Sequence, residues 1–176
     1  MSDSSKKHKD EAPATLRFGI YTCSTSRYAK LKSGEKADDL SGDIIESLLR
    51  SHGHSVSVRG TIPDDAALIR EAATAMLNDH GVDVLIFCGG TGVAPSDVTI
   101  ETVSPLFEKT LPGFGEIFRR ISYDEIGSAA VMSRAVGGVA RGKAVFCLPG
   151  SPDAVRLCME KLVLPESGHI VKHARE

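Results

Sequence analysis

Three short glycine-containing segments are the first feature of this sequence that could do chemistry. GGTG spans residues 89–92, PGSP spans residues 149–152, and an SGD triplet begins at Ser41. Glycine has no Cβ, so the main chain can approach an anion closely and point its N–H groups at it. The helix starts expected at SGD and GSP would add the positive end of a helix dipole. Together the segments predict a phosphate-binding site, although GGTG alone would equally fit a tight strand-to-helix turn.

Two aspartates are spaced so that they should reach the same place. Asp97 lies five residues after Gly92, and Asp64 belongs to the turn at residues 63–65 that follows a predicted strand. Phosphoryl and adenylyl transfer needs a divalent cation, and Mg²⁺ is commonly held by one or two carboxylates together with substrate oxygens. We therefore predict that Asp64 and Asp97 are catalytic and bind Mg²⁺. The alternative for each is that it only caps the following helix, and Asp39 is expected to be a solvated loop residue.

The glycine segments differ from two common nucleotide-binding motifs. GGTG lacks the lysine of a P-loop, and it does not have the GxGxxG spacing of a dinucleotide-binding turn. Both motifs are therefore excluded. Four cysteines lie far apart in apolar surroundings, so we expect buried, reduced thiols, with a thiolate metal site as the alternative. They are Cys23, Cys88, Cys147 and Cys158.

Alternating strands and helices must position these residues. Apolar runs predict strands at residues 16–23, 54–62, 82–88 and 143–148, and residues 133–142 are ambiguous between strand and loop. Amphipathic spacing and breaker residues predict helices at residues 41–53, 63–81, 99–107, 113–127 and 151–164. This alternation is typical of a three-layer α/β/α sandwich with a mainly parallel sheet.

The ends of the predicted strands locate the site. In an open α/β sheet, ligands bind outside the carboxyl ends of the strands. The segments at residues 22–25, 89–92 and 149–152 all follow such ends, which implies one cleft. A long polar loop at residues 24–40 borders it and is expected to be functional or mobile. We expect its basic residues to be solvated, with closure over a polyphosphate as the alternative; they are Arg27, Lys30, Lys32 and Lys36.

Composition narrows the class of protein. The chain has 176 residues with 41% hydrophobic content and a formal net charge of −2. We expect a flexible tail at residues 1–14 and one domain at residues 15–176. The slight negative charge predicts no nucleic-acid binding, and the lack of a long apolar run or signal peptide predicts a cytoplasmic protein without membrane contact. A small ligand is the expected partner.

Several motifs in a fixed order resemble a known family. They are GGTG, Asp97-Val98-Thr99, PGFGE at residues 112–116, Ser133-Arg134-Ala135 and PGSP. This set resembles the MoaB/MogA family of molybdenum cofactor biosynthesis proteins over roughly residues 16 to 164. The segment at residues 113–127 is more similar to the MoaB branch. The resemblance implies a molybdopterin-binding, MogA-like fold.

The resemblance also implies roles for individual residues. In the adenylyl-transferring members of the family, an acidic turn residue and an aspartate are linked to the use of Mg-ATP, and Asp64 and Asp97 match these two residues. Arg134 is the best candidate for a cation that binds a phosphate. The implied substrate-binding positions are Ser41, Gly42, Gly89, Gly90, Thr91, Gly92, Thr99, Glu116, Ser133, Arg134, Pro149, Gly150 and Ser151.

The implied activity is Mg-ATP-dependent adenylylation of molybdopterin, with ATP and molybdopterin as substrates. The terminal phosphate of molybdopterin would attack the α-phosphate of ATP, and pyrophosphate would leave without a covalent enzyme intermediate. A non-catalytic molybdopterin-binding or carrier protein is the alternative, and a nucleotide-binding assembly protein is a third. The resemblance further implies a homo-oligomer, with a hexamer favoured over a trimer, and other enzymes of the pathway as partners.

Overall fold

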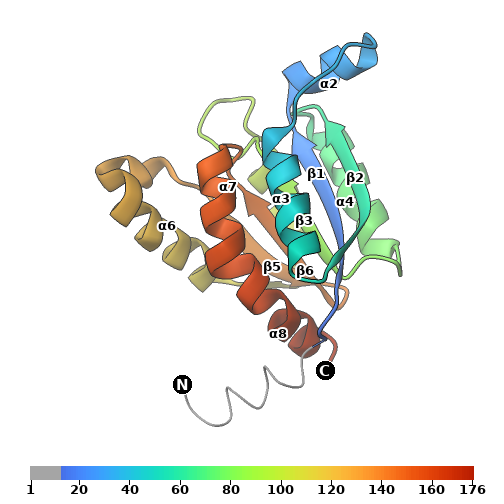
Figure 1. Cartoon of the computed structure of the whole chain (residues 1–176), viewed down its shortest axis with the longest axis vertical. Coiled ribbons are helices and arrows are strands. Elements are labelled where there is room, and N and C mark those ends of the chain that lie inside the picture. The colour runs from blue at the N-terminus through green and yellow to red at the C-terminus, as the bar shows by residue number, and fades with distance from the viewer. Residues whose placement is uncertain (1–12) are drawn as a thin grey trace.

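One six-stranded sheet forms the centre of the molecule in the computed structural model, which describes residues 13–176 (Figure 1). Most of the tail predicted at residues 1–14 lies outside the described part. The strand order is β2-β1-β3-β6-β5-β4. The strands are β1 Arg17–Cys23, β2 Ser55–Ile62, β3 Val84–Cys88, β4 Lys109–Thr110, β5 Val136–Ala140 and β6 Lys143–Leu148.

Four adjacent strands run parallel, and the two strands at the other side of the sheet do not. β2, β1, β3 and β6 are parallel neighbours, whereas β5 is antiparallel to β6 and β4 is antiparallel to β5. In register, Thr22 near the end of β1 pairs with Cys88, which in turn pairs with Leu148 at the end of β6. The carboxyl ends of these three strands therefore meet at one edge of the sheet.

Helices connect the strands on both sides of the sheet. The α-helices are α2 Thr25–Lys32, α3 Leu40–Ser51, α4 Ala66–Asn78, α5 Thr99–Val103, α6 Pro112–Ile126, α7 Pro152–Cys158 and α8 Leu164–Ala174. Two short 3-10 helices, η1 Ser104–Leu106 and η2 Gly127–Met132, follow α5 and α6, and the π-helical segment η3 Met159–Val163 joins α7 to α8.

The core has two halves because alternate strand residues point to opposite faces. On one face, Phe18, Ile20 and Ile86 pack with the buried sides of α3, α6, α7 and α8. On the other face, Leu85 and Phe87 pack with α4 and α5. The predicted three-layer α/β/α sandwich with a mainly parallel sheet is confirmed.

The prediction of a long polar loop at residues 24–40 is partly wrong, because the first half of this segment forms helix α2. The Ser24 side chain accepts a hydrogen bond from the Arg27 amide and caps the helix, and Lys30 and Lys32 occupy the last turn, where positive charge is favourable. No residue of α2 is buried, and the helix stands out from the end of the sheet (Figure 1). Without a buried face there was no apolar periodicity to reveal it.

Smaller differences concern the ends of elements. Helix α3 begins one residue before Ser41, with Asp39 rather than a serine as its cap. Helix α4 ends at Asn78, three residues before the predicted stop at Gly81. The ambiguous segment at residues 133–142 contains β5, and the two-residue strand β4 was not predicted. Among the described residues, no helix is long and apolar enough to span a bilayer.

Candidate functional site

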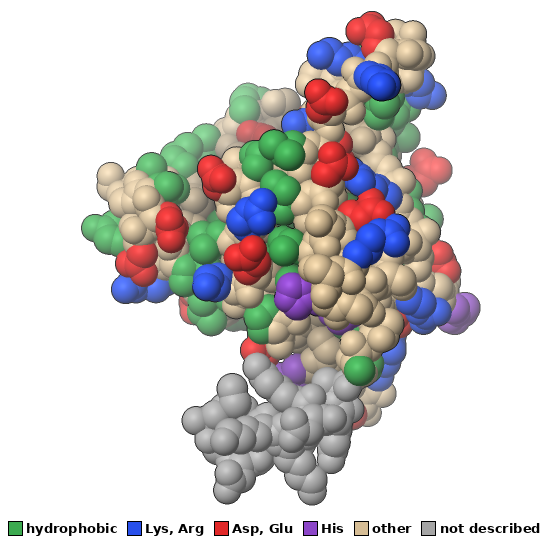
Figure 2. All heavy atoms as spheres, in the orientation of Figure 1, with side chains coloured by type: hydrophobic (Ala, Val, Ile, Leu, Met, Phe, Trp, Pro, Cys, Tyr) green, Lys and Arg blue, Asp and Glu red, His purple; other side chains and the backbone are tan. Residues whose placement is uncertain are grey.

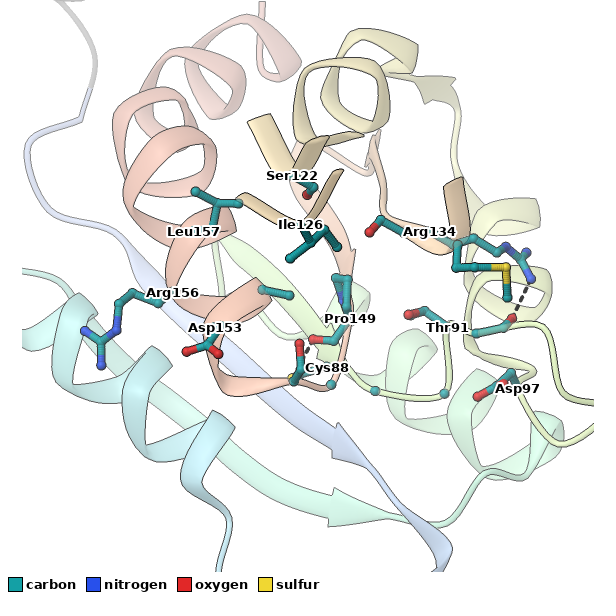
Figure 3. A pocket seen from close by; sticks show the side chains of 18 of the residues that line it. Cys88, Thr91, Asp97, Ser122, Ile126, Arg134, Pro149, Asp153, Arg156 and Leu157 are labelled. Carbon is teal, nitrogen blue, oxygen red and sulfur yellow. Dashed lines mark hydrogen bonds between the residues drawn. The ribbon is translucent and has the colours of Figure 1, made fainter. Parts of the chain in front are cut away.

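A cavity of about 1040 Å³ opens at the carboxyl edge of the sheet (Figure 3). The loops after β3 and β6 form its floor, and α6, η2 and α7 form its outer wall. Ten of the predicted site residues line it: Gly89, Gly90, Thr91, Gly92, Asp97, Ser133, Arg134, Pro149, Gly150 and Ser151. The two glycine loops that lie 60 residues apart in the chain therefore meet in one cavity.

The loop after β3 requires glycine at two successive positions. Gly89 and Gly90 have φ angles of +99° and +61°, which L side chains rarely adopt. A Cβ on Gly90 would lie 2.5 Å from the Thr99 hydroxyl oxygen and 2.8 Å from Oδ1 of Asp64. Both oxygens thus converge on the space beside the Gly90 main chain, although neither residue lines the main cavity. A side chain at Gly90 would fill that space.

The Asp64 carboxylate is positioned by the start of α2. Its Oδ2 accepts hydrogen bonds from the Thr25 amide at 2.9 Å and from the Thr25 hydroxyl at 2.8 Å. No hydrogen bond to its Oδ1 occurs within the described residues. The capping alternative is wrong for Asp64, because the neighbouring Asp65 caps α4 by accepting from the Leu68 amide. One oxygen of Asp64 remains available to a ligand.

Asp97 has a similar arrangement within the loop that follows GGTG. Its Oδ2 accepts a hydrogen bond from the Ala94 amide at 2.9 Å and lies 2.6 Å from the position of a Cβ on Gly92. Its other oxygen makes no hydrogen bond in the described part of the chain. The capping alternative fails here too, because Val98 precedes α5 and no side chain caps that helix. Asp97 points into the cavity region seen in Figure 3.

Thr99 is fully buried, yet its hydroxyl makes no hydrogen bond of acceptable geometry. Among the described residues it is the single buried side-chain nitrogen or oxygen in that condition. An unsatisfied buried polar group costs about 1–3 kcal/mol, so such groups are rare outside functional sites. The Thr99 hydroxyl lies beside Gly90 together with Oδ1 of Asp64, so it is a candidate for contact with a bound ligand.

Arg134 holds the glycine loop from the opposite side. Its Nη1 donates a hydrogen bond to the Gly92 carbonyl at 2.7 Å, and its Nη2 pairs with the Glu101 carboxylate. The hydrogen bond from Arg134 lowers the pKa of Glu101 below its usual value. Arg134 therefore fixes the end of GGTG to α5, because its guanidinium binds both Glu101 and the Gly92 carbonyl, and Figure 3 shows the second of these contacts.

Three predicted site residues are engaged elsewhere or face solvent. The buried Ser41 hydroxyl donates to the Gly150 carbonyl at 2.8 Å, and the Gly42 amide donates to Oδ1 of Asp39 at 3.1 Å. Neither Ser41 nor Gly42 lines the cavity. Glu116 is exposed on the first part of α6 and is also outside the cavity lining. The structure thus brings Ser41 next to the site but leaves Glu116 apart from it.

Arg59, on β2, ties the start of α3 to the sheet. Its guanidinium donates to Asp43 and Glu46 at 2.6 Å each and to Asp39 at 3.4 Å. Asp39 also accepts from the Thr22 hydroxyl at 2.8 Å, so the expectation that it is a solvated loop residue is wrong. The role of Arg59 could not be predicted from the sequence, because the residues that contact it lie 13 to 20 positions away.

The residues of the outer wall of the cavity were not predicted from the sequence either. Ser122, Ile126, Asp153 and Leu157 come from α6 and α7, and Ile126 and Leu157 face each other across the opening (Figure 3). Their spacing of four residues places each pair on one helix face. That spacing was readable in the sequence, but it could not show that these faces look into the cavity. The further wall residues are Glu125, Ala129, Met132, Ala154, Arg156, Glu160 and Lys161.

Cys23 and Cys88 line the cavity, but as protonated thiols. Burial raises the pKa of each thiol to about 12. All four cysteines are buried and unpaired, as predicted. No cluster of three or more His, Cys, Asp or Glu side chains suited to a metal occurs among residues 13–176. The cavity therefore offers neither a thiolate nucleophile nor a thiolate metal site.

Comparison with known protein families gives a match over most of the chain. Residues 19–169 match the family model described as a probable molybdopterin binding domain. This range includes both glycine loops, Asp64, Asp97 and the whole outer wall of the cavity.

Relatives and solved structures agree with that match. Molybdenum cofactor biosynthesis protein B of Bacillus subtilis is 43% identical over 97% of each chain. Molybdopterin adenylyltransferase of Pyrococcus furiosus is 42% identical over 97% of this chain and 98% of its own. A crystal structure of tungsten cofactor synthesizing protein MoaB from Pyrococcus furiosus superposes with a TM-score of 0.82 at 40% identity, covering 94% of this chain and 100% of the other.

Proposed function

The chain belongs to the MoaB/MogA family of molybdenum cofactor biosynthesis proteins, and from this premise we propose that it transfers an adenylyl group from ATP to molybdopterin. The observation that carries the proposal is the convergence at Gly90. There, one oxygen of Asp64 and the unsatisfied Thr99 hydroxyl lie within 3 Å of one point, beside the cavity. A buried polar group without a hydrogen-bond partner in the protein is expected where a bound ligand supplies the missing hydrogen bond.

The available oxygens suit Mg²⁺, which prefers hard oxygen ligands and is usually bound by one or two carboxylates. Asp64 and Asp97 each keep one carboxylate oxygen without a hydrogen bond among the described residues. We propose these two aspartates as the residues that hold the cation. When bound, Mg²⁺ would neutralise negative charge on the phosphates of ATP.

The proposed reaction requires positioning more than covalent catalysis. A phosphate oxygen of molybdopterin attacks the α-phosphorus of ATP, and the bond from that phosphorus to the bridging oxygen of pyrophosphate breaks. The attacking phosphate is ionised, so no side chain has to remove a proton. The main-chain N–H groups of residues 90–92 and 150–151 would orient the phosphates, and Arg134 supports this by holding the Gly92 carbonyl.

The size and lining of the cavity also support the proposal that it binds two substrates. Ligand pockets for single small molecules usually measure about 300–1,000 Å³. At about 1040 Å³ this cavity lies at the upper limit of that range. Its floor is glycine and its wall includes Ile126, Met132 and Leu157, so it offers main-chain donors for phosphates and apolar contacts for ring systems.

We also propose that the protein is a cytoplasmic homo-oligomer, with a hexamer favoured and a trimer possible. Three apolar side chains of α6 and η2 that do not line the cavity are exposed by 51–81%, and Figure 2 shows hydrophobic side chains on this side of the molecule. They are Ile117, Tyr123 and Val131. Exposed apolar clusters of this kind commonly mark association surfaces. Other enzymes of the pathway would supply molybdopterin and use the product.

The test is direct. Purified protein is incubated with molybdopterin and Mg-ATP, and adenylated molybdopterin and pyrophosphate are measured. We expect both products from the unaltered chain, and Asp97→Asn should slow the transfer by about a hundredfold or more while pterin binding stays within about twofold. Binding of molybdopterin without any product would identify a carrier protein instead. Transfer at the unaltered rate by Asp97→Asn would show that the metal assignment is wrong.

A further inference from the structure

Arg27 is the one arginine lining the cavity that has no carboxylate partner among the described residues. Arg134 pairs with Glu101, and Arg156 lies 3.7 Å from the Glu160 carboxylate. The Arg27 guanidinium makes a single hydrogen bond, from Nε to the Asp38 carbonyl at 2.9 Å. Both of its terminal nitrogens are left without a partner in the described chain. A half-buried guanidinium with two unused donors is suited to an anion.

Arg27 also joins the main cavity to a second one. The smaller cavity, of about 310 Å³, lies between α2 and the segment that follows it. It is lined by Ser26, Arg27, Lys30, Ala37 and Asp38. Two basic side chains and one hydroxyl therefore face one carboxylate, which leaves a positive balance. A ligand in the main cavity that carries a chain of phosphates would reach this space past Arg27.

Helix α2 links this cation to the candidate metal site. Thr25, in the first turn of α2, donates two hydrogen bonds to Oδ2 of Asp64. Arg27 follows two residues later on the same helix, and its backbone amide donates to the Ser24 cap at 3.4 Å. The carboxylate proposed to hold Mg²⁺ and the unpaired guanidinium are therefore fixed to the same short helix. Both face the edge of the sheet where the glycine loops lie.

We propose that the space between α2 and residues 37–38 is a pyrophosphate subsite. Arg27 and Lys30 bind the β- and γ-phosphates of ATP there and hold pyrophosphate after the bond to the α-phosphorus breaks. The bridging oxygen keeps the electron pair of that bond, and the Arg27 guanidinium stabilises the charge that develops on the leaving group. The proposal rests on the proposed function, since it assigns the leaving group of that reaction to this space.

The experiment measures binding of inorganic pyrophosphate and of AMP, each with Mg²⁺, by titration calorimetry of the full chain. Arg27→Gln should weaken pyrophosphate binding by about tenfold or more and leave AMP binding within about twofold. Arg27→Lys should retain part of the affinity, because it keeps the charge but loses the bidentate geometry. Lys30→Gln should weaken pyrophosphate binding less than Arg27→Gln does.

Lys32→Gln is the matched control. It removes one positive charge from the same helix, but Lys32 lines neither cavity and lies over the Tyr28 ring at 5.6 Å. We expect no change in either affinity. Pyrophosphate binding that is equal in Arg27→Gln and the unaltered chain would overturn the subsite. An equal loss of AMP and pyrophosphate binding would also overturn it, because Arg27 would then not distinguish the leaving group.

The outcome separates the subsite from the proposed function. If the unaltered protein yields no adenylated molybdopterin but binds pyrophosphate in a way that depends on Arg27, the proposed function fails and the subsite stands. If adenylated molybdopterin forms and pyrophosphate inhibits Arg27→Gln as strongly as the unaltered enzyme, the subsite fails and the proposed function stands.

Discussion

The two ends of the sheet differ in how completely their polar groups are hydrogen-bonded. At the amino end, the Asp83 carboxylate accepts three hydrogen bonds from Arg17 and one from Arg175, at 2.7–3.0 Å, and the residue is 5% exposed. At the carboxyl end, Asp64 and Asp97 each leave one oxygen without a hydrogen bond in the described residues, and the Thr99 hydroxyl has none.

This difference shows how one fold separates stability from binding. A carboxylate whose oxygens are all paired stabilises the folded state and has no capacity left for a ligand. A carboxylate with one unpaired oxygen can bind a cation, at some cost in stability while the cation is absent. Substitutions at the two ends of the sheet test that separation.

The largest effect is expected at the carboxyl end. Asp64→Asn should reduce adenylyl transfer by about a hundredfold or more, because the amide cannot supply the charge that holds the cation. The matched control is Asp65→Asn, which removes the neighbouring charge while asparagine still caps α4. It should retain activity within about twofold in the same steady-state assay. If both variants lost activity equally, the charge of the turn rather than Asp64 would matter.

The next effect is on stability at the amino end. Burial by itself would raise the pKa of Asp83, but hydrogen bonds from Arg17 and Arg175 outweigh it and hold the pKa well below its usual range. Asp83→Asn should lower the free energy of unfolding by about 2–4 kcal/mol near pH 7, less than a fully buried pair because both arginines are about half exposed. Urea unfolding measures this difference.

The pH dependence of that difference gives a second check. A lowered pKa in the folded state means that the stabilisation is fully present above about pH 4 and is lost as the pH falls toward the folded-state value. The gap between unaltered protein and Asp83→Asn should therefore narrow in acid. Asp124→Asn is the control, because its pair with Arg120 is exposed and screened by solvent, so its loss should leave stability nearly unchanged. A gap that is independent of pH would refute the assignment.

The smallest effect should have opposite signs at two neighbouring threonines of α5. Thr99→Val removes a hydroxyl that has no partner and should raise the free energy of unfolding by about 1 kcal/mol while slowing adenylyl transfer severalfold. Thr102→Val removes a hydroxyl that donates to the Val98 carbonyl at 2.7 Å, so it should lower stability by about 1 kcal/mol and leave activity unchanged. Thermal unfolding and the transfer assay distinguish the two. Destabilisation by Thr99→Val would show that its hydroxyl is already satisfied.

Local patterns predicted most of the architecture because they depend on near neighbours along the chain. The near-continuous apolar run of β3 is typical of a strand covered on both faces, and the structure buries all five of its residues. Breakers such as Gly53 marked the end of α3, where the glycine adopts a φ of +79°. Helix α2 escaped prediction because it buries nothing, so only its cap and its contact with Asp64 reveal it.

The sequence by itself therefore determined the order of strands and helices, the edge where the glycine loops emerge, and the residue types that could bind phosphate and Mg²⁺. Only the tertiary structure decided which of those groups remain unpaired. That property depends on contacts such as Thr25 with Asp64, 39 residues apart, and Ser41 with Gly150, 109 residues apart. Hydrogen bonding of a buried group is set by its neighbours in space, and no periodicity along the chain records them.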